Sequence, residues 1–338
     1  MAIRTGLIGY GLGGMAFHAP LIHAVPELEL TAVATSRAGE VHARYPDAAV
    51  TDAAALIADP SIALVAISTP NDSHFPLAKA ALLAGKHVVI DKPFTNTIAE
   101  AEELDALAEA SGLVIGAFHN RRWDGDFLTV QQVIASGRLG EVMNVEMRWD
   151  RFRPEVTKAW RDMPEIGSGI LADLAPHLID QALVLFGTPD ALSADIAVQR
   201  TDARTDDYFE ITLFYGSRRV LLSAGRLFAR ARPRFSLHGM AGSFVKSGLD
   251  PQEPMMKAGG KPGTHQEDPA TFGVLTLGDG STETVPTLRG DYRDYYSGVA
   301  RAIADGGEAP VPASDAILGL RIMELARQSA REGRRLSL

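Results

Sequence analysis

The chain has 338 residues, of which 46% are hydrophobic and 22% are charged, and its formal net charge is −9. This length predicts two domains, and the composition is typical of a globular protein. The acidic charge argues against a nucleic-acid partner, and the lack of cysteine excludes disulfides, thiolate nucleophiles and Cys-ligated metal sites.

Membrane association is also not expected. No apolar run reaches the length needed to cross a bilayer, and the N-terminal residues enter a strand without a long apolar targeting stretch. We therefore expect a cytoplasmic enzyme or binding protein with no membrane partner.

The chain begins with a short buried strand over Ile3–Ile8, followed by G-Y-G-L-G-G and a helix over about Met15–Ala24. A G-x-G-x-x-G turn between a strand and a helix is typical of dinucleotide-binding sites. Its glycines permit a tight turn, close approach of a pyrophosphate and close helix packing, and the helix N-terminus favours phosphate. We expect cofactor contacts at Gly9, Gly11, Leu12 and Gly14.

The second strand, Leu28–Ala34, ends in Thr35-Ser36-Arg37. Sites selective for NAD place an acidic residue here, which would repel the 2′-phosphate of NADP. The hydroxyl of Ser36 and the guanidinium of Arg37 favour NADP over NAD. Alternatively, Ser36 caps the next helix and Arg37 is merely solvated.

Further α/β units follow in alternation, with strands at Ala63–Ser68, Val88–Ile90 and Leu113–Phe118 and helices at Pro76–Ala84 and Ile98–Ser111. Polar residues follow each strand, at the sheet edge where a doubly wound sheet binds ligands. Among them, Thr69, Asn71 and His74 are candidate cofactor contacts.

The strand ending in V-V-I-D-K-P-F carries Lys92 at this edge, and Pro93 favours an extended backbone at the lysine. Lys92 is thus a candidate cation of the cofactor site. The alternative is a solvated lysine after a strand.

The second half of the chain is rich in predicted strands, at 141–152, 191–199, 208–215, 219–227, 234–238 and 243–245, and no helix is predicted between the last five of them. This pattern predicts a mostly antiparallel sheet with one face to be covered, for which a second copy of the chain is a natural partner. Residues 248–271 are predicted to form a long irregular loop or lid, and helices are expected at about 292–304 and 314–331. The expected fold class is α/β, with a doubly wound parallel sheet followed by a large open sheet.

A second group of polar residues lies on the predicted helix that starts in Gly167–Gln181 and runs to about Phe186. Asp173, His177 and Asp180 fall on one face of it, and Pro176 costs the helix a hydrogen bond beside them. Such a local conflict beside titratable residues often marks a functional site. Asp173 and His177 also have metal-ligand spacing, which leaves a metal site as an alternative, but no third ligand is evident and no metal is predicted.

Hydride transfer from an alcohol requires a nicotinamide, a proton acceptor and a group that stabilises the developing alkoxide. Lys92 can stabilise the oxygen, and His177 suits proton transfer near neutral pH. Asp173 can fix the histidine tautomer or bind a substrate hydroxyl. A structural role is the alternative. A single buried histidine such as His177 is often only a core residue whose hydrogen bonds are satisfied.

At these residues the chain resembles the Gfo/Idh/MocA oxidoreductases, the glucose–fructose oxidoreductase and inositol dehydrogenase family. The resemblance covers essentially the whole chain and rests on G-Y-G-L-G-G, T-P-N-D-S-H, D-K-P and the G-x-x-x-D-x-x-x-H-x-x-D pattern from Gly169 to Asp180. The usual E-K-P is D-K-P here, which leaves the Lys–Pro pair intact.

The resemblance implies a Rossmann domain over residues 1–121 and a substrate-binding and oligomerisation domain over 122–338, whose last helix can pack back on the first domain. It implies Lys92, Asp173 and His177 as the catalytic set and dimers or tetramers formed through the open sheet.

The stretches F-H-N-R-R-W-D, D-R-F-R-P and A-W-R look most similar to a subgroup of the family that contains NADP-dependent scyllo-inositol dehydrogenases and uncharacterised relatives. By that likeness the candidate substrate contacts are Asn120, Arg121, Trp160 and Arg161, of which the last two can equally serve packing or an interface. The expected activity is hydride transfer between NADP and a polyol or sugar, with an inositol as the favoured substrate class. The alternatives are reduction of another sugar, aldehyde, ketone or dihydrodiol, and a regulator that senses NADP(H) without catalysis.

Overall fold

The computed structural model describes residues 2–156 and 168–338. The chain divides into two compact units: the first comprises Met1–Trp123, Pro251–His265 and Asp291–Ile317, and the second comprises Asp124–Asp250, Gln266–Gly290 and Leu318–Leu338. The chain thus returns twice to the first unit after leaving it. The sequence pattern did not reveal these returns, because contacts between distant segments leave no local periodicity.

The first unit contains a six-stranded parallel sheet in the order β3-β2-β1-β4-β5-β6. Its strands are β1 (Ile3–Ile8), β2 (Leu28–Ala34), β3 (Ala49–Thr51), β4 (Leu64–Ile67), β5 (His87–Ile90) and β6 (Ile115–Ala117). β4 is apolar and buried along its whole length, as expected for a strand covered on both faces. The strand order reverses between β1 and β4, and the carboxyl ends of strands at such a point form a ligand-binding crevice.

Helices connect these strands and complete the unit: η1 (Gly14–His18), α1 (Ala19–Ala24), α2 (Ala38–Arg44), α3 (Ala53–Ala58), η2 (Asn71–Ser73), α4 (His74–Leu83), α5 (Ile98–Ser111), η3 (Asn120–Trp123), α8 (Gln252–Lys257) and α9 (Arg293–Asp305). The start of α5 is fixed by a capping box, in which Thr97 accepts from the Glu100 backbone and the Glu100 carboxylate accepts from the Thr97 backbone. Gly112, with φ of +63°, ends this helix.

The second unit is built on a nine-stranded sheet in the order β14-β13-β12-β11-β7-β10-β9-β8-β15. Its strands are β7 (Val142–Asp150), β8 (Ala191–Ala197), β9 (Tyr208–Tyr215), β10 (Arg218–Gly225), β11 (Phe235–Gly239), β12 (Gly242–Lys246), β13 (Gly273–Leu277), β14 (Thr282–Val285) and β15 (Leu336–Ser337). Within the described chain, β7 and β10 pair in parallel and the other ladders are antiparallel. The predicted fold class, a doubly wound parallel sheet followed by a large and mostly antiparallel sheet, is confirmed.

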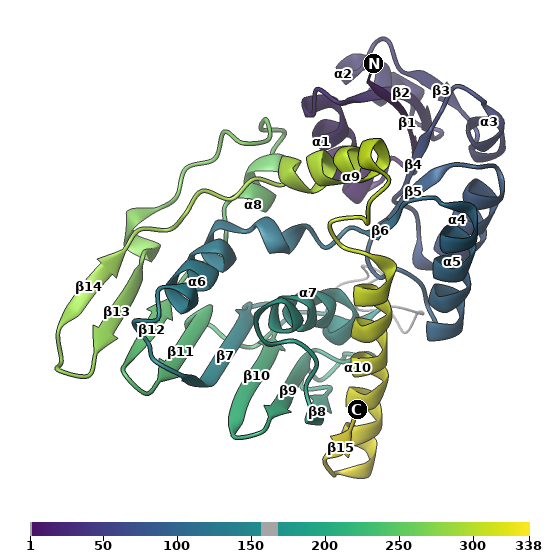
Figure 1. Cartoon of the computed structure of the whole chain (residues 1–338). Coiled ribbons are helices and arrows are strands. Elements are labelled where there is room, and N and C mark those ends of the chain that lie inside the picture. The colour runs from purple at the N-terminus through teal and green to yellow at the C-terminus, as the bar shows by residue number, and fades with distance from the viewer. Residues whose placement is uncertain (1, 157–167) are drawn as a thin grey trace. The chain divides into compact units, whose positions relative to one another are not determined.

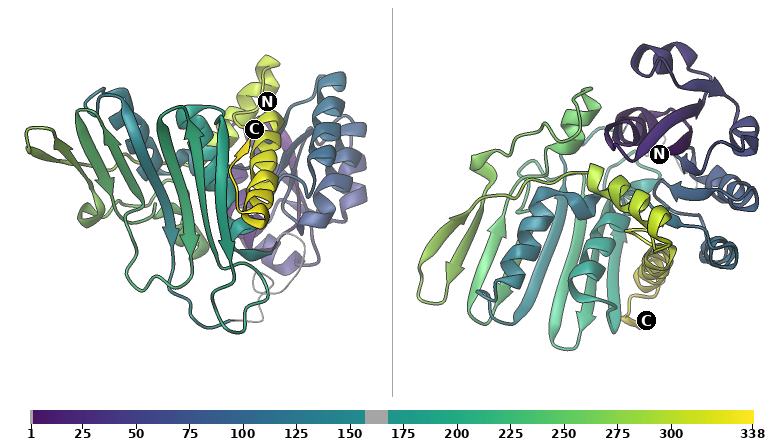
Figure 2. Two further views of the ribbon diagram at one scale, coloured as in Figure 1. Left: turned by 90° about the horizontal axis from the view of Figure 1, so that it is seen from below. Right: turned by 45° about the horizontal axis from the view of Figure 1, so that its top comes forward.

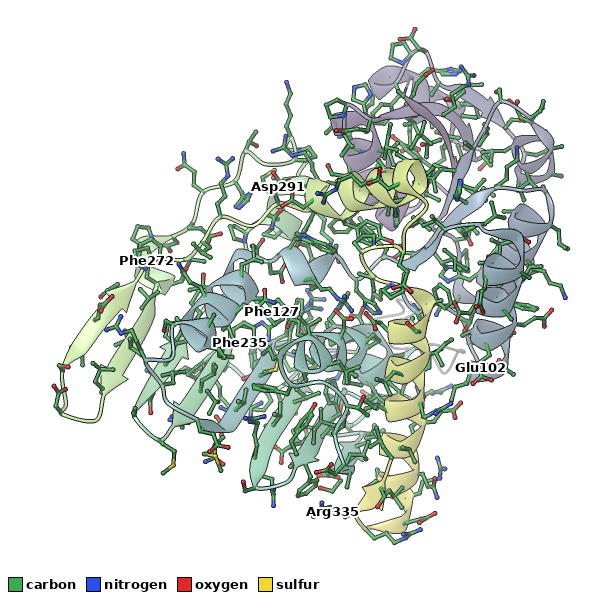
Figure 3. The ribbon with its side chains drawn as sticks, viewed as in Figure 1. Glu102, Phe127, Phe235, Phe272, Asp291 and Arg335 are labelled. Atoms are coloured by element: carbon green, nitrogen blue, oxygen red, sulfur yellow. The ribbon has the colours of Figure 1, made fainter. Side chains whose placement is uncertain are left out.

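Helices α6 (Gly125–Ala135) and α7 (Gly169–Phe186) lie on the same face of this sheet (Figures 1 and 2). Phe127 of α6 packs on Phe235 of β11 with ring centroids 6.4 Å apart, and Figure 3 shows the two side chains together. The core of the unit forms between these helices and the inward-facing residues of the strands. The long C-terminal helix α10 (Ala313–Glu332) adds Ile322, Met323 and Ala326 to it.

One prediction about α7 needs correction. Among the described residues, α7 is the one helix long and apolar enough to cross a membrane by length and composition, although no such run was expected. Most of it, 78%, is buried inside the protein. Its apolar character therefore reflects packing on β9 and β10 in the core of the second unit.

The region 248–271 is also less irregular than predicted, because it contains the short helix α8 and the turn η5 (Pro269–Thr271). The short strands β3, β13, β14 and β15 were not predicted at all.

Candidate active site

The turn after β1 holds three glycines in different surroundings. A Cβ on Gly9, whose φ is +97°, would lie 2.2 Å from the Ser68 carbonyl oxygen, and one on Gly14 would lie 2.1 Å from the Gly9 carbonyl oxygen. A Cβ on Gly11 would meet no described atom within 4 Å. The next residue, Leu12, is 48% exposed. Tight packing at two glycines and open space at Gly11 fit a turn that a pyrophosphate approaches closely.

At the end of β2, Arg37 is exposed and its guanidinium lies 3.8 Å from the Glu40 carboxylate. Its backbone N–H donates to the hydroxyl of Thr35, 3.2 Å away. Arg37 itself occupies the N-cap position of α2, so Ser36 does not cap this helix, whereas the alternative of a solvated Arg37 agrees with its exposure. An exposed hydroxyl and guanidinium at this point fit a 2′-phosphate, and the preference for NADP stays a prediction.

After β4, the polar residues mainly bind one another. The hydroxyl of Ser73 donates to that of Thr69, 2.6 Å away, and Asn71 begins η2. His74 is fully buried, with Nδ1 2.8 Å from the Pro93 carbonyl oxygen and Nε2 3.0 Å from the Thr69 carbonyl oxygen. His74 thus ties the loop after β4 to the loop after β5, and a direct contact of its side chain with the cofactor stays a prediction.

The loop after β5 fixes the backbone of Lys92. Asp91 Oδ1 accepts a hydrogen bond from the Lys92 backbone N–H at 2.8 Å, and Asp91 Oδ2 accepts one from the Ser68 hydroxyl at 2.9 Å. The peptide bond between Lys92 and Pro93 is cis. Asp91, which the sequence left without a role, therefore links the ends of β4 and β5 beside the candidate catalytic lysine.

After β6, Asn120 and Arg121 are both buried, with 6% of each exposed. The Arg121 guanidinium donates to the Tyr292 hydroxyl at 2.7 Å and pairs with the Glu253 carboxylate. These partners come from the two segments that return to the first unit. Sequence reasoning did not identify Glu253 or Tyr292, because neither stands in a motif. Arg121 therefore has structural partners, and its predicted substrate contact stays a prediction.

In the second unit, α7 carries Asp173, His177 and Asp180, which are 6%, 6% and 4% exposed. Asp173 and His177 lie one helical turn apart on the same face. The Arg151 guanidinium at the end of β7 lies 3.9 Å from the Asp173 carboxylate, and the His177 ring lies 6.0 Å from that of Trp149. Pro176 lies inside the helix, as predicted.

The N-terminus of α7 is anchored by Asp206, which the sequence did not single out. Its carboxylate accepts from the Leu171 backbone N–H at 2.6 Å, and its carbonyl oxygen accepts from the Ile170 N–H at 2.9 Å. Burial raises the pKa of Asp206, although the bond from Leu171 acts in the opposite direction. These two bonds satisfy backbone N–H groups in the first turn of α7, the helix that carries Asp173 and His177.

Arg234, the residue immediately before β11, contacts α7. Its guanidinium donates to the Gln181 side chain at 2.7 Å and lies 5.1 Å from the Trp149 ring centroid. Trp149 and Arg234 thus belong to the surroundings of the helix that carries His177. The remaining candidates, Trp160 and Arg161, lie outside the described residues.

Comparison with protein-family models gives two matches. The model described as "Oxidoreductase family, NAD-binding Rossmann fold" (GFO_IDH_MocA) matches residues 3–119. That described as "Oxidoreductase family, C-terminal alpha/beta domain" matches residues 131–338.

Similar proteins match over their full length. The chain is 48% identical to the uncharacterized oxidoreductase YdgJ of Escherichia coli, covering 99% of each chain. It is 40% identical to the scyllo-inositol 2-dehydrogenase (NADP(+)) IolW of Bacillus subtilis, covering 99% of this chain and 96% of the relative. Among solved structures, the Bacillus subtilis protein yvaA matches with a TM-score of 0.96 and 39% identity, covering 100% of this chain and 98% of the other. An oxidoreductase from Bacillus cereus matches with a TM-score of 0.92 and 32% identity, covering 100% and 99%.

Proposed function

Because the chain belongs to the Gfo/Idh/MocA oxidoreductase family, we propose that it transfers a hydride between NADP and a hydroxyl-bearing carbon of a polyol or sugar, favourably an inositol. The observation that carries the reaction type is the buried Asp173–His177 pair on one face of α7, which supplies a proton acceptor. The likeness to scyllo-inositol 2-dehydrogenase supports the substrate class and the use of NADP.

Cofactor binding is assigned to the first unit. Backbone N–H groups of the glycine turn would hold the pyrophosphate, with Gly11 as the point of closest approach. Ser36 and Arg37 would hold the 2′-phosphate. The bound nicotinamide supplies the hydride acceptor or donor.

In the oxidative direction, Lys92 orients the substrate hydroxyl and stabilises negative charge on its oxygen. His177 takes the hydroxyl proton while the carbinol carbon gives up its hydride, so that a carbonyl group forms. Asp173, with Arg151 near it, fixes the His177 tautomer or binds a neighbouring hydroxyl of the substrate. Asn120, Arg121, Trp160 and Arg161 are the proposed substrate contacts.

We also propose that the chain forms a homodimer or homotetramer through the face of the large sheet opposite α6 and α7. That face carries the ion pairs Glu146–Arg148 and Asp150–Arg232 and the ring of Phe214, which lies beside Arg219. A symmetric interface brings the same face of two copies together, and a face that carries both charge signs and an aromatic ring offers groups that can pair across it.

The proposed function is tested by a spectrophotometric screen of inositols, other polyols and sugars, run in parallel with NADP and NAD. We expect NADPH to form with at least one inositol. Activity confined to NAD would contradict the proposal that Ser36 and Arg37 bind the 2′-phosphate of NADP. Tight NADPH binding without turnover of any substrate, in either direction, would favour the NADP(H)-sensing alternative.

A further inference from the structure

The helix after the glycine turn begins with a π-helical turn, η1 (Gly14–His18). Such turns are rare and occur frequently at functional sites, because the wider turn changes the direction of the side chains it carries. Here the last residue of the turn is His18, whose side chain is completely buried. Its role is not explained by phosphate binding at the glycines.

The ring of His18 lies between two polar groups of the first unit. Its Nδ1 is 2.7 Å from the Tyr296 hydroxyl on α9. Its Nε2 is 3.4 Å from Asp91 Oδ2, a distance that is long for a hydrogen bond. The Phe118 ring packs against the imidazole with centroids 4.2 Å apart, which limits its rotation.

Asp91 connects this histidine to the backbone of Lys92. One carboxylate oxygen faces His18 and accepts from the Ser68 hydroxyl, while the other accepts from the Lys92 backbone N–H. Burial alone would raise the pKa of Asp91, but His18, followed by His74 and Lys92, lowers it below its ordinary value. The carboxylate therefore stays ionised and can hold both donors.

The surroundings leave this arrangement little freedom. A Cβ on Gly13 would lie 2.5 Å from the Ser68 hydroxyl oxygen and 2.7 Å from Asp91 Oδ2. The glycine turn thus packs directly on the groups that hold the lysine loop.

We propose that His18 is a positioning residue for Lys92, acting through Asp91, and that Tyr296 orients its ring. The carboxylate requires the proton of His18 on Nε2, which leaves Nδ1 to the Tyr296 hydroxyl. The chain Tyr296–His18–Asp91 then fixes the backbone from which the Lys92 side chain extends. This inference rests on the proposed function, in which Lys92 acts on the substrate oxygen.

The neighbouring tyrosines provide a matched test. Tyr295 and Tyr296 are both fully buried, and the Tyr295 hydroxyl has no hydrogen-bond partner among the described residues. We expect Tyr296→Phe to lower kcat about tenfold, the order expected for one lost hydrogen bond, and to alter the pH profile of kcat. Tyr295→Phe should leave both unchanged. The Kd for NADPH, measured by fluorescence, should change less than about twofold in either variant.

Variants closer to the lysine should have larger effects. We expect His18→Gln and Asp91→Asn to lower kcat on the order of a hundredfold, because a small displacement of a catalytic group has effects of this size. His23→Gln, an exposed histidine on the same helix, is the control. If His18→Gln does not fold, Asp91→Asn and Tyr296→Phe still test the chain.

A readout without turnover separates this inference from the proposed function. In ¹⁵N NMR of imidazole groups, the signal of His18 should show the proton on Nε2, and it should shift in Tyr296→Phe and not in Tyr295→Phe. Equal behaviour of the two tyrosine variants, in kcat and in the His18 signal, would overturn the inference. If the protein oxidises no polyol but the His18 signal behaves as expected, the arrangement stands and the proposed function fails.

Discussion

Lys92 is the residue on which the proposed chemistry depends most directly. Replacing it with alanine should reduce turnover on the order of a hundredfold to a thousandfold, because the charge on the substrate oxygen loses its stabilising cation. NADPH affinity should change little, since Asp91 and Ser68 hold the loop through other atoms. Initial rates and fluorescence titration measure the two effects. Lys79→Ala, which removes a surface ion pair with Glu103, is the control, and unchanged turnover in Lys92→Ala would refute the assignment.

Arg37 should decide between the two nicotinamide cofactors. Its removal by Arg37→Ala should raise the KM for NADP by roughly tenfold to a hundredfold, which corresponds to the free energy lost with one or two charge-assisted hydrogen bonds. The KM for NAD should change less than about twofold, since NAD has no 2′-phosphate. Arg4→Ala removes another exposed arginine of the same unit and serves as the control. Similar losses with both cofactors would mean that Arg37 acts through folding.

Glu267 should make the stability of the second unit depend on pH. Burial, followed by the charge of Asp250, raises its pKa from 4.5 to about 7. The folded state then binds this proton more tightly than the unfolded state, so wild-type stability should decline as the pH rises from 4.5 to about 7. The free energy of unfolding, measured in urea at several pH values, should not show this decline in Glu267→Gln. The control Glu27→Gln, which changes an exposed glutamate, should show the same decline as the wild type. Parallel pH profiles for wild type and Glu267→Gln would contradict the prediction.

At the level of elements, the sequence predicts best where the signals are local. The helix Ile98–Ser111 has the predicted bounds, and local residues mark both of its ends, since a capping threonine precedes it and a glycine follows it. The strand–glycine turn–helix motif and the polar strand ends were equally visible. The π-helical start of the next helix was not, since no sequence pattern separates it from an ordinary helical turn.

Elements that depend on distant partners could not be predicted. Strands β3 and β15 have three and two residues and exist through pairing with β2 and β8. The same holds in the site: Asp91 was visible beside Lys92, but its partner His18 and the more distant Tyr296 come from other helices. Glu253 reaches Arg121 only because α8 belongs to the first unit.

Helix α7 depends on an acceptor outside its own sequence. Replacing Asp206 with alanine should destabilise the second unit by about 1–3 kcal/mol, because the Leu171 N–H loses its partner in a partly buried position. The loss is measured by urea unfolding. Asp202→Ala changes an exposed carboxylate in the same loop and should have little effect. If both variants unfold at the same urea concentration, the anchor has no energetic importance.

For the whole molecule, the proposed interface can be tested on the open face of the large sheet. Leu221 lies on β10 opposite Thr212 and beside Glu146, in the middle of that face. Leu221→Arg should shift the protein from dimer or tetramer towards monomer in gel filtration with light scattering, because it places a long charged side chain in the middle of the proposed interface, where association would remove it from water. Leu83→Arg changes an exposed leucine on α4 and should not alter the mass. A monomeric wild type would contradict the proposed assembly.

The two returns of the chain to the first unit have a consequence for synthesis. Tyr296 follows His18 by 278 residues, and the partners of Arg121 come from α8 and the start of α9. On the ribosome, the nucleotide-binding half is therefore made first but lacks these partners until most of the other half has emerged. A fragment ending at Trp123 would leave His18 and Arg121 without them, so the first unit reaches its final form only late in translation.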